Sequence, residues 1–517
     1  MGLIAFLAMA LLALAPLAAR AAAAGRRLVD EDRLAASRPP PPPRGAPPPP
    51  IRGSASVDLD GWGKDVPPDF LGISHEWTGV EELADPEFLQ LFQDLAAYGT
   101  GPLVLRVGGG STDQQLEVPA AHVWEALRAV NRKIGATFIL GINFESGDAG
   151  LTRRQLEAVR RELPHEAVAA VELGNEPNFY KRKLGMPSSK YLACCYVNDW
   201  HDSAVALSCP AGGDAYEGAS GAACWGRQLA GPAWGHVHMH PGTLDWFLRV
   251  NAKWVGVATV HWYKDTAETP NTAASLLDEG RMRRDAASLA ALVETAGRHQ
   301  KGLRVAEMNT ISNSGRRGVS DTLGGALWTL DAALEAAAAG ATGTNFHWGA
   351  GQTTYTAVIR RTADGKPPMV KPAFYAYLLL QMALSTGSRI LPDCRVALEA
   401  GRPGALKVWP LVRAADGGAR AVLINKHATA AASLRLAFNR GALGGAKLLR
   451  LDAPAGGLWA AGDVRIANMS YGWEGIKMFG TPYAELLQPE LDAGGNSVYT
   501  IALPPASAAL FIAGGPK

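Results

Sequence analysis

The chain has 517 residues, of which 48% are hydrophobic and 19% are charged. This balance is typical of a folded globular protein and excludes both a disordered chain and one embedded in a membrane. Lysine and arginine number 50 against 48 aspartate and glutamate residues, so no overall positive field favours a nucleic acid as partner. The length accommodates a large barrel and a smaller second domain.

The amino terminus is apolar from Leu3 to Ala19, and a short alanine tract with Gly25-Arg26-Arg27 follows it. Residues 1–24 resemble a signal peptide for export, although no lysine or arginine precedes the apolar run. The run also reaches the lower limit for spanning a bilayer, so an uncleaved membrane anchor is the alternative. Both interpretations predict a protein outside the cytosol, either secreted to a cell wall or matrix, directed to a lysosome or vacuole, or anchored to a membrane.

Residues 25–53 form a proline-rich linker, with nine prolines between positions 39 and 50. Such a stretch favours extended polyproline II and cannot pack a core. We therefore interpret it as a spacer between the export segment and the folded part.

Five cysteines suit an oxidising compartment. Cys194, Cys195, Cys209 and Cys224 lie close together in the sequence, and Cys394 lies far from them. A bridge between Cys209 and Cys224 would close a glycine-rich stretch, but the sequence leaves the pairing open. No paired metal-ligand spacing accompanies these cysteines, so we expect no metal there. Asn468-Met469-Ser470 is the one N-glycosylation sequon.

From about residue 66, short apolar or β-branched runs alternate with longer segments of helical periodicity. The predicted strands are 70–74, 103–107, 137–142, 167–173, 228–231, 255–261, 303–306 and 344–347. The predicted helices between them include 86–97, 121–133, 153–163, 284–297 and 323–339. Eight successive β-then-α units predict an α/β fold, a closed (β/α)8 TIM barrel over residues 54–385. A doubly wound open sheet is less favoured, because no dinucleotide-type glycine fingerprint follows a strand.

After residue 385 the sequence changes to short alternating runs separated by glycine and proline. The predicted strands are 405–411, 419–424, 433–437, 446–451, 497–503 and 509–512. They predict a carboxy-terminal β-sandwich over residues 386–517. We expect the early strand at 54–60 to join this sandwich.

Two glutamates follow barrel strands at the end where the βα loops converge on a pocket. Glu176 lies in Asn175-Glu176-Pro177 after the fourth strand, and Glu307 ends the seventh. We expect them to face one another across the barrel mouth. Mutual repulsion in a buried site would separate their pKa values, giving one acid that holds its proton and one ionised nucleophile. Taken alone, Glu176 is explained equally well as a residue that caps a turn and as a catalytic residue. The second glutamate, Glu307, is what favours a catalytic role for both.

These motifs resemble those of the clan A glycoside hydrolases and, within that clan, family 79, which includes heparanase-like and β-glucuronidase members. Asn175-Glu176-Pro177 marks the clan, and Trp348-Gly349-Ala350-Gly351 and His261-Trp262-Tyr263 are similar to family 79 elements. Leu105-Arg106-Val107-Gly108-Gly109 is similar to a further element after the second strand. The resemblance extends over about residues 54–517.

The resemblance implies a retaining hydrolase that cleaves β-linked glucuronic acid from a polysaccharide or proteoglycan, without a cofactor or metal. Glu176 would be the acid/base and Glu307 the nucleophile. Asn175 would donate to the sugar 2-hydroxyl, Tyr263 would hold Glu307 ionised, and His261 would lie beside them.

Further residues are candidates for binding the sugar. Gly349, Ala350 and Gly351 would present backbone N–H groups to the uronic acid carboxylate, joined by Tyr355 and His347. The spacing from the Gly349-Ala350-Gly351 turn to Tyr355 is longer than in the family pattern. A role for His347 in the core is as well supported as a role in binding the sugar. Asp113 either binds a sugar hydroxyl or caps the helix that follows it.

Two other functions remain open. The first is another clan A activity, such as that of an arabinofuranosidase or xylosidase, which needs no carboxylate-binding turn. The second is a non-catalytic protein that binds cell-wall glycans, against which the presence of both Glu176 and Glu307 argues.

Overall fold

The structure is a computed structural model. It describes residues 48–99, 101–180, 187–208, 229–349, 353–359, 369–385, 387–392, 394, 396–399, 401–439, 443–472 and 476–514. The predicted signal segment, most of the predicted linker, and the half-cystines of the suggested Cys209–Cys224 bridge lie outside these ranges. Within the described ranges, no helix combines the length and the apolar character that crossing a membrane requires.

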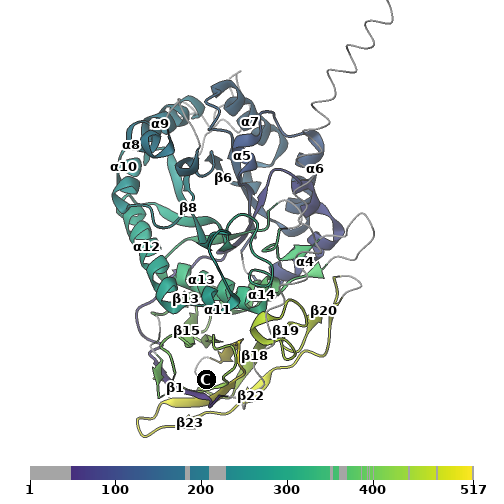
Figure 1. The fold of residues 1–517 in the computed structure, drawn as a ribbon, viewed down its shortest axis with the longest axis vertical. Helices are drawn as coiled ribbons and strands as arrows, with labels where there is room; N and C mark the ends of the chain where they lie inside the picture. The colour runs from purple at the N-terminus through teal and green to yellow at the C-terminus, as the bar shows by residue number, and fades with distance from the viewer. Residues whose placement is uncertain are drawn as a thin grey trace, which may run out of the picture. The chain divides into compact units, whose positions relative to one another are not determined.

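Eight parallel strands close into a barrel in the order β10-β3-β4-β5-β6-β7-β8-β9. Figure 1 shows β6 and β8 of this barrel with helices around them. The strands are β3 (Leu71–Glu76), β4 (Val104–Gly108), β5 (Thr137–Ile142), β6 (Val168–Leu173), β7 (Leu229–Trp234), β8 (Val255–Asp265), β9 (Gly302–Ile311) and β10 (Gly343–His347). They coincide in order and type with the eight predicted strands, so the TIM barrel is confirmed. β8 and β9 run several residues beyond the predicted ends, because polar residues continue the hydrogen-bonded ladder into the barrel mouth.

Helices surround this barrel between its strands. They are α4 (Pro86–Ala96), α6 (Ala121–Ile134), α7 (Ala149–Glu162), α8 (Ser188–Cys194), α9 (Tyr196–Leu207), α10 (Pro241–Asn251), α12 (Glu279–Arg298), α13 (Leu323–Ala339) and α14 (Pro372–Leu384), with short turns α5 (Ser111–Gln114) and α11 (Ala273–Leu276). Several begin at side-chain caps: Asp148, Asp278 and Thr322 each accept a hydrogen bond from a backbone N–H in the first turn of α7, α12 and α13. A disulfide joins Cys194 to Cys195 where α8 meets α9.

The carboxy-terminal domain is a sandwich of two sheets, as the alternating runs predict. One sheet has the order β14-β1-β17-β24-β23, and the other has the order β19-β18-β25-β16-β15-β13-β2, with β22 also pairing with β18. Their strands are β1 (Ile51–Val57), β2 (Lys64–Val66), β13 (Ser388–Ile390), β14 (Ala397–Leu398), β15 (Leu406–Arg413), β16 (Ala419–Asn425), β17 (Ala432–Phe438), β18 (Ala446–Asp452), β19 (Arg465–Ile466), β22 (Glu485–Leu487), β23 (Glu490–Leu491), β24 (Ser497–Leu503) and β25 (Ser507–Ala513). β1 pairs in parallel with β17, so a segment that precedes the barrel in sequence belongs to this sheet.

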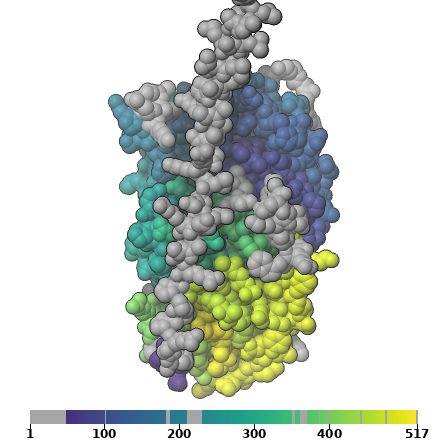
Figure 2. All heavy atoms as spheres, turned by 45° about the vertical axis from the view of Figure 1, so that its right-hand side comes forward, coloured from purple at the N-terminus to yellow at the C-terminus, as the bar shows by residue number. Residues whose placement is uncertain are grey.

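The second sheet packs against the barrel helices as well as against the first sheet. Every residue of β16 is buried, which is expected for a central strand that is covered on both faces. α13 and α14 are buried around almost their whole circumference, because they lie between the barrel and this sheet. Trp409 and Val422 of the sheet belong to the same apolar cluster as the barrel core. Figure 2 shows the two domains in direct contact.

A cluster of buried charges lies in this contact. Asp331 of α13 is fully buried and pairs with Lys407 Nζ of β15 at 3.0 Å and with Lys426 Nζ, which follows β16. Trp409 Nε1 also donates to Asp331, over 2.9 Å. Burial by itself raises the pKa of Asp331, but the two lysines outweigh it and hold that pKa well below its usual range. The cluster therefore fixes α13 to the sheet through an ionised carboxylate.

We expect Asp331→Asn to lower the free energy of unfolding by about 1–3 kcal/mol at pH 7, because the buried Lys407 and Lys426 lose one carboxylate partner and keep only Glu279 and Glu335. Thermal or urea unfolding measures the change. Glu294→Gln is the control, since Glu294 lies on the surface of α12 in an exposed pair with Arg298, and we expect it to change stability little. Equal stability of the Asp331 variant and the wild type would contradict a clamping role for the cluster.

Candidate active site

Glu176 follows β6 in a turn that requires unusual backbone angles. Gly174 and Glu176 both have positive φ, 73° and 48°, and Pro177 ends the extended chain. Glu176 N donates to Ala233 O over 2.9 Å, which fixes the turn to the end of β7. A non-glycine residue in the left-handed region is strained and is found mostly where function requires it. The turn places the Glu176 side chain in the wall of a cleft at the barrel mouth.

Glu307 lies in β9 beside His261 of β8, just after a register shift between these strands. One carboxylate oxygen of Glu307, one of Glu176 and a ring nitrogen of His261 all lie within 4.8 Å of one another. Retaining glycosidases hold their two carboxyl groups about 5 Å apart, whereas inverting ones leave a wider gap for water. The spacing therefore fits a double-displacement reaction.

Two donors hold the Glu307 carboxylate. Arg106 Nη1 donates to Oε2 over 2.6 Å, and the Tyr263 hydroxyl donates to Oε1 over 2.7 Å. Burial raises the pKa of Glu307, but the charges of His347, His261 and Arg106 and the bond from Tyr263 outweigh it and lower that pKa well below its usual range. Burial and the nearby Glu307 charge raise the pKa of Tyr263, so the phenol keeps its proton and remains a donor. Glu307 is thus an ionised carboxylate suited to be a nucleophile.

Arg106 is the fully buried centre of this arrangement. Its Nε donates to Glu172 Oε2 over 2.8 Å, and its Nη2 donates to Asn175 Oδ1 over 2.9 Å. Because Asn175 accepts through its oxygen, its amide N–H groups are left as donors toward the cleft, which Asn175 lines. Sequence reasoning gave neither Arg106 nor Glu172 a role. Each of these two residues is a charge inside an otherwise apolar barrel strand. This pattern could have indicated their role, since a buried charge requires a buried partner.

Glu176 has a different environment from Glu307. Its side chain is 24% exposed, against 8% for Glu307. Oε1 of Glu176 lies 2.8 Å from Nδ1 of His261, so a proton is shared along this contact. Glu176 is therefore open to the cleft and able to exchange a proton there, which suits a general acid/base.

A third carboxylate, which sequence reasoning missed, lines the same cleft. Glu76 ends β3, and it accepts hydrogen bonds from Gly110 N and Ser111 N at 3.2 and 2.8 Å. His347 Nε2 lies 3.5 Å from Glu76 Oε1, and His347 Nδ1 lies 3.9 Å from Glu307 Oε2. Burial lowers the pKa of His347, but Glu307 and Glu76 outweigh it and raise that pKa. His347 thus lies between two carboxylates and lines the cleft, as predicted for a site residue.

Asp113 does not lie at the cleft, which corrects its prediction as a ligand for a sugar hydroxyl or as a helix cap. It lies within α5, and its two oxygens accept hydrogen bonds from Phe144 N, Glu145 N, Asn175 N and the Tyr180 hydroxyl. The Asp113 carboxylate therefore holds the backbone of the Asn175–Glu176 turn in place. Its role is to position other residues rather than to contact a sugar.

The loop after β10 is only partly described. Gly349 follows β10 with a φ of 70°, while Ala350 and Gly351 lie outside the described residues. Tyr355 lines the cleft, with its ring centroid 6.2 Å from that of Tyr263 and 5.9 Å from that of His347. Lys371 Nζ donates to the carbonyls of Thr353 and Thr354 over 3.0 and 2.9 Å, and so fixes the loop that carries Tyr355.

The cluster of Glu176, His261 and Glu307 also has the composition of a metal site. Both oxygens of Glu307 already accept hydrogen bonds, and the Arg106 guanidinium that donates one of them carries a positive charge. A cation there would be repelled by Arg106 and would displace Tyr263. We therefore interpret the three residues as a proton-transfer and nucleophile site.

The cleft has a volume of about 1170 Å³ and extends from the carboxylate pair along β8 toward α12. Phe179, which is 55% exposed, lies in its wall three residues after Glu176. Farther along, Lys264, Arg281 and Arg284 line it. The first two of these are paired with Asp285 and Asp265, respectively. A cleft of this size holds more than one sugar ring.

The fold, a (β/α)8 barrel with a β-sandwich domain, is similar to the folds of several solved glycoside hydrolases. It is similar to a 4-O-α-L-rhamnosyl-β-D-glucuronidase from Fusarium oxysporum 12S, solved with Rha-GlcA, at a TM-score of 0.70 and 17% identity over 89% of this chain and 99% of that one. It is also similar to the GH51 arabinofuranosidase from Xanthomonas axonopodis pv. citri, at a TM-score of 0.61 and 13% identity over 90% and 100% of the two chains. CelM2, a bifunctional glucanase-xylanase from a metagenome library, has a TM-score of 0.56 and 12% identity over 90% and 99%.

Neither a protein-family model nor a curated protein sequence matches the chain. Identities between 12% and 17% relate these proteins by fold alone.

Tyr263→Phe is expected to raise the pKa of Glu307, because it removes a hydrogen bond that favours the ionised form. Hydrogen bonds to charged groups are worth about 1.5–3 kcal/mol, so the acid limb of kcat/KM should move up by about one pH unit or more. The measurement is a pH profile extended to the lowest pH at which the protein stays folded, because the Glu307 pKa lies well below its usual range. Tyr499→Phe is the control, since that phenol donates to Gly444 O in the sandwich, far from any catalytic group. An unchanged acid limb would mean that Tyr263 does not set the state of Glu307.

Glu176→Ala is expected to keep the first step on substrates with good leaving groups but to slow hydrolysis of the intermediate by about 10²-fold or more. Azide needs no general base, so it should accelerate this variant and give a glycosyl azide of retained configuration. Product NMR and the rate with and without azide provide the measurement. Wild type should not respond to azide. If Glu307→Ala instead gave the glycosyl azide of retained configuration, Glu307 would be the acid/base and Glu176 the nucleophile.

Proposed function

We propose that the protein is a retaining glycoside hydrolase of the family 79 type that removes β-linked glucuronic acid from a polysaccharide or proteoglycan. The observation that carries the proposal is the close pair of differently held carboxylates, Glu307 ionised by Arg106 and Tyr263 and Glu176 open to the cleft beside His261. Such asymmetry is what a double displacement requires.

In the first step, a Glu307 oxygen attacks the anomeric carbon while the glycosidic C–O bond breaks and Glu176 gives its proton to the leaving oxygen. In the second, Glu176 takes a proton from water, whose oxygen attacks the same carbon and releases Glu307. Asn175 would donate to the sugar 2-hydroxyl, a contact that strengthens as positive charge develops on the ring.

Several features support a uronic acid in the sugar-binding part of the cleft. His347 is held in a setting that favours its charged form, and Tyr355 adds a phenol next to it. The Fusarium protein, whose fold is similar, is described as a β-D-glucuronidase in complex with Rha-GlcA. A cationic imidazole and a phenol are suitable partners for a sugar carboxylate.

Glu76 favours a second candidate, an arabinofuranosidase-type activity. Its carboxylate lies in the same part of the cleft, held by two backbone N–H groups, and a pocket carboxylate repels a uronate but accepts bonds from neutral sugar hydroxyls. The similarity to a GH51 arabinofuranosidase supports this alternative.

The protein is proposed to act outside the cytosol. The disulfide between Cys194 and Cys195 supports an oxidising compartment. Secretion followed by removal of the amino-terminal segment, or retention by that segment at a membrane, would both satisfy this proposal.

The deciding experiment measures release of nitrophenol from the β-D-glucuronide, β-D-xyloside, α-L-arabinofuranoside and β-D-glucoside. We expect turnover of the glucuronide in preference to the other three, because only it carries a carboxylate for His347. Glu307→Gln should reduce turnover by about 10⁴-fold or more, since it removes the nucleophile and keeps the side chain's shape.

Glu294→Gln serves as the matched control, because it makes the same change on the surface of α12. Preference for the arabinofuranoside would establish the second candidate and overturn the glucuronidase proposal. If the protein hydrolysed none of the four substrates and no glucuronic-acid-containing oligosaccharide, the proposal that it is a hydrolase would be overturned. A glycan-binding protein would then be favoured.

A further inference from the structure

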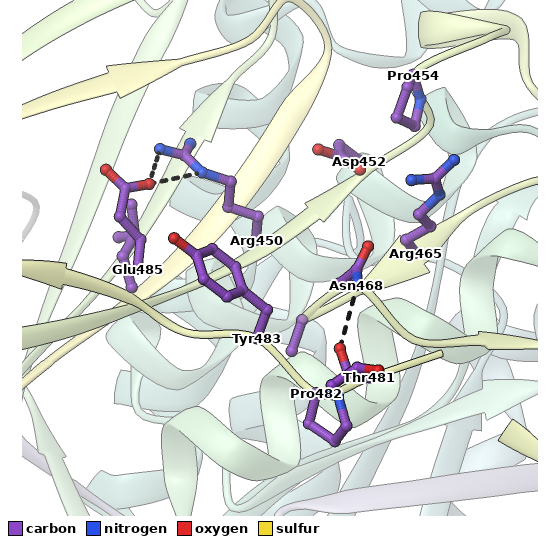
Figure 3. A pocket seen from close by; sticks show the side chains of 11 residues that line it. Arg450, Asp452, Pro454, Arg465, Asn468, Thr481, Pro482, Tyr483 and Glu485 are labelled. Carbon is purple, nitrogen blue, oxygen red and sulfur yellow. Dashed lines mark hydrogen bonds and ion pairs between the residues drawn. The ribbon is translucent and has the colours of Figure 1, made fainter. Parts of the chain in front are cut away.

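A second pocket lies in the sandwich domain and shares no lining residue with the catalytic cleft. It has a volume of about 370 Å³, and its walls come from β18, β19 and the segment 481–485 that leads into β22 (Figure 3). This is within the size range of small-molecule sites. Nothing in the proposed reaction uses it.

An exposed aromatic ring forms one wall of this pocket. Tyr483 is 63% exposed, so its ring is not part of the sandwich core. Its backbone is nevertheless fixed, because Tyr483 N donates to Ala467 O over 2.9 Å. In Figure 3 the phenol points toward the pair formed by Arg450 and Glu485. An open aromatic face on a fixed backbone can serve as a binding surface, because the apolar C–H face of a pyranose ring stacks well on it.

Polar groups with free hydrogen-bonding capacity line the same pocket as this ring. Asp452 and Arg465 are opposite each other in the register of β18 and β19, and among the described residues neither side chain makes a hydrogen bond. Asn468 also lines the pocket and is held by a bond from its Nδ2 to Thr481 O, over 3.2 Å. A carboxylate, a guanidinium and an amide together offer the acceptors and donors that a pair of sugar hydroxyls requires.

The charges of the pocket balance. Arg450 donates through Nε and Nη2 to Glu485, and through Nη1 to Ala502 O over 2.8 Å, so its charge is matched and its position is fixed. Asp452 and Arg465 also carry opposite charges, although no hydrogen bond joins them. A site without excess charge has no preference for sulfate, phosphate or uronate, and it favours a neutral, hydroxyl-rich ligand.

We propose that this pocket is a second glycan-binding site, which takes a neutral sugar unit stacked on Tyr483 and hydrogen-bonded by Asp452, Arg465 and Asn468. The site is independent of the proposed catalysis, because it lies on the other domain's strands and involves neither carboxylate of the active site. It would bind the protein to a polysaccharide while the catalytic cleft hydrolyses a bond elsewhere in the same polysaccharide.

The sugar has two conceivable sources. One is a separate polysaccharide, and the other is a glycan attached to Asn468 itself. Asn468 belongs to the sequon and lies with Ala467 in a tight hairpin turn, both with positive φ, at the edge of the pocket. The Ser470→Ala variant removes the sequon but keeps Asn468, which separates these two sources.

The test is calorimetric titration of Glu307→Gln protein, which should bind without cleaving, with cellohexaose, xylohexaose and an oligoglucuronate. Protein from a non-glycosylating host is expected to show two sites for at least one neutral oligosaccharide. Adding Tyr483→Ala should remove the second site or weaken it about tenfold or more, because the stacking face is lost. Tyr483→Phe keeps that face and should retain the site.

Leu486→Ala is the matched control, since Leu486 is 72% exposed on β22 and does not line the pocket. In a glycosylating host, a second site that is absent from the parent protein but present in Ser470→Ala would mean that the sugar comes from Asn468. The absence, in the unglycosylated protein, of any neutral-probe site that Tyr483→Ala removes or weakens would overturn the proposal. A single site that this variant removes would support it, because the cleft need not bind a neutral sugar. A second site selective for the oligoglucuronate would overturn its neutral character.

Discussion

The buried guanidinium of Arg106 is the interaction on which the active site depends. It connects Glu172 within β6, Asn175 after that strand and Glu307 of β9, all through hydrogen bonds of 2.6 to 2.9 Å. Without it, two buried carboxylates would face one another in a region of low dielectric constant, and at least one would take up a proton. Arg106 therefore allows the barrel to hold an ionised Glu307 inside its mouth.

The division of work between the two glutamates follows from what surrounds each one. Glu307 has a cationic and a phenolic donor on its two oxygens, which favours the charged form of a nucleophile. Among the described residues, the Glu176 side chain has a hydrogen bond with His261 alone, and it is partly exposed, so water and a leaving group can reach it from the cleft. Neither assignment depends on motif resemblance, because the local charges and donors alone distinguish the roles.

The sequence predicts the barrel well, because each strand is a short buried run and each strand end is visible as a change to polar residues. It also predicts Glu176, which follows β6, and Glu307, although β9 continues beyond Glu307 to Ile311. It does not predict the partners Arg106, Glu172 and Glu76, since the contacts that give them a role join strands far apart in the chain. Asp113 was assigned wrongly for the same reason: a carboxylate near a turn suggests a ligand, and only the fold shows its four donors.

The sandwich is part of what makes the active site rigid. α13 lies in the chain between β9, which carries Glu307, and β10, which ends at His347, and it packs against both strands. Asp331 fixes α13 to the sandwich through the buried lysines Lys407 and Lys426. Protein interiors are close-packed and respond to displacement as units. The second domain therefore helps to keep the hydrogen bonds to Glu307 short, although it does not touch the substrate. The barrel and the sandwich are thus one mechanical unit, which is consistent with β1 and β2 of the sandwich preceding the first barrel strand in sequence.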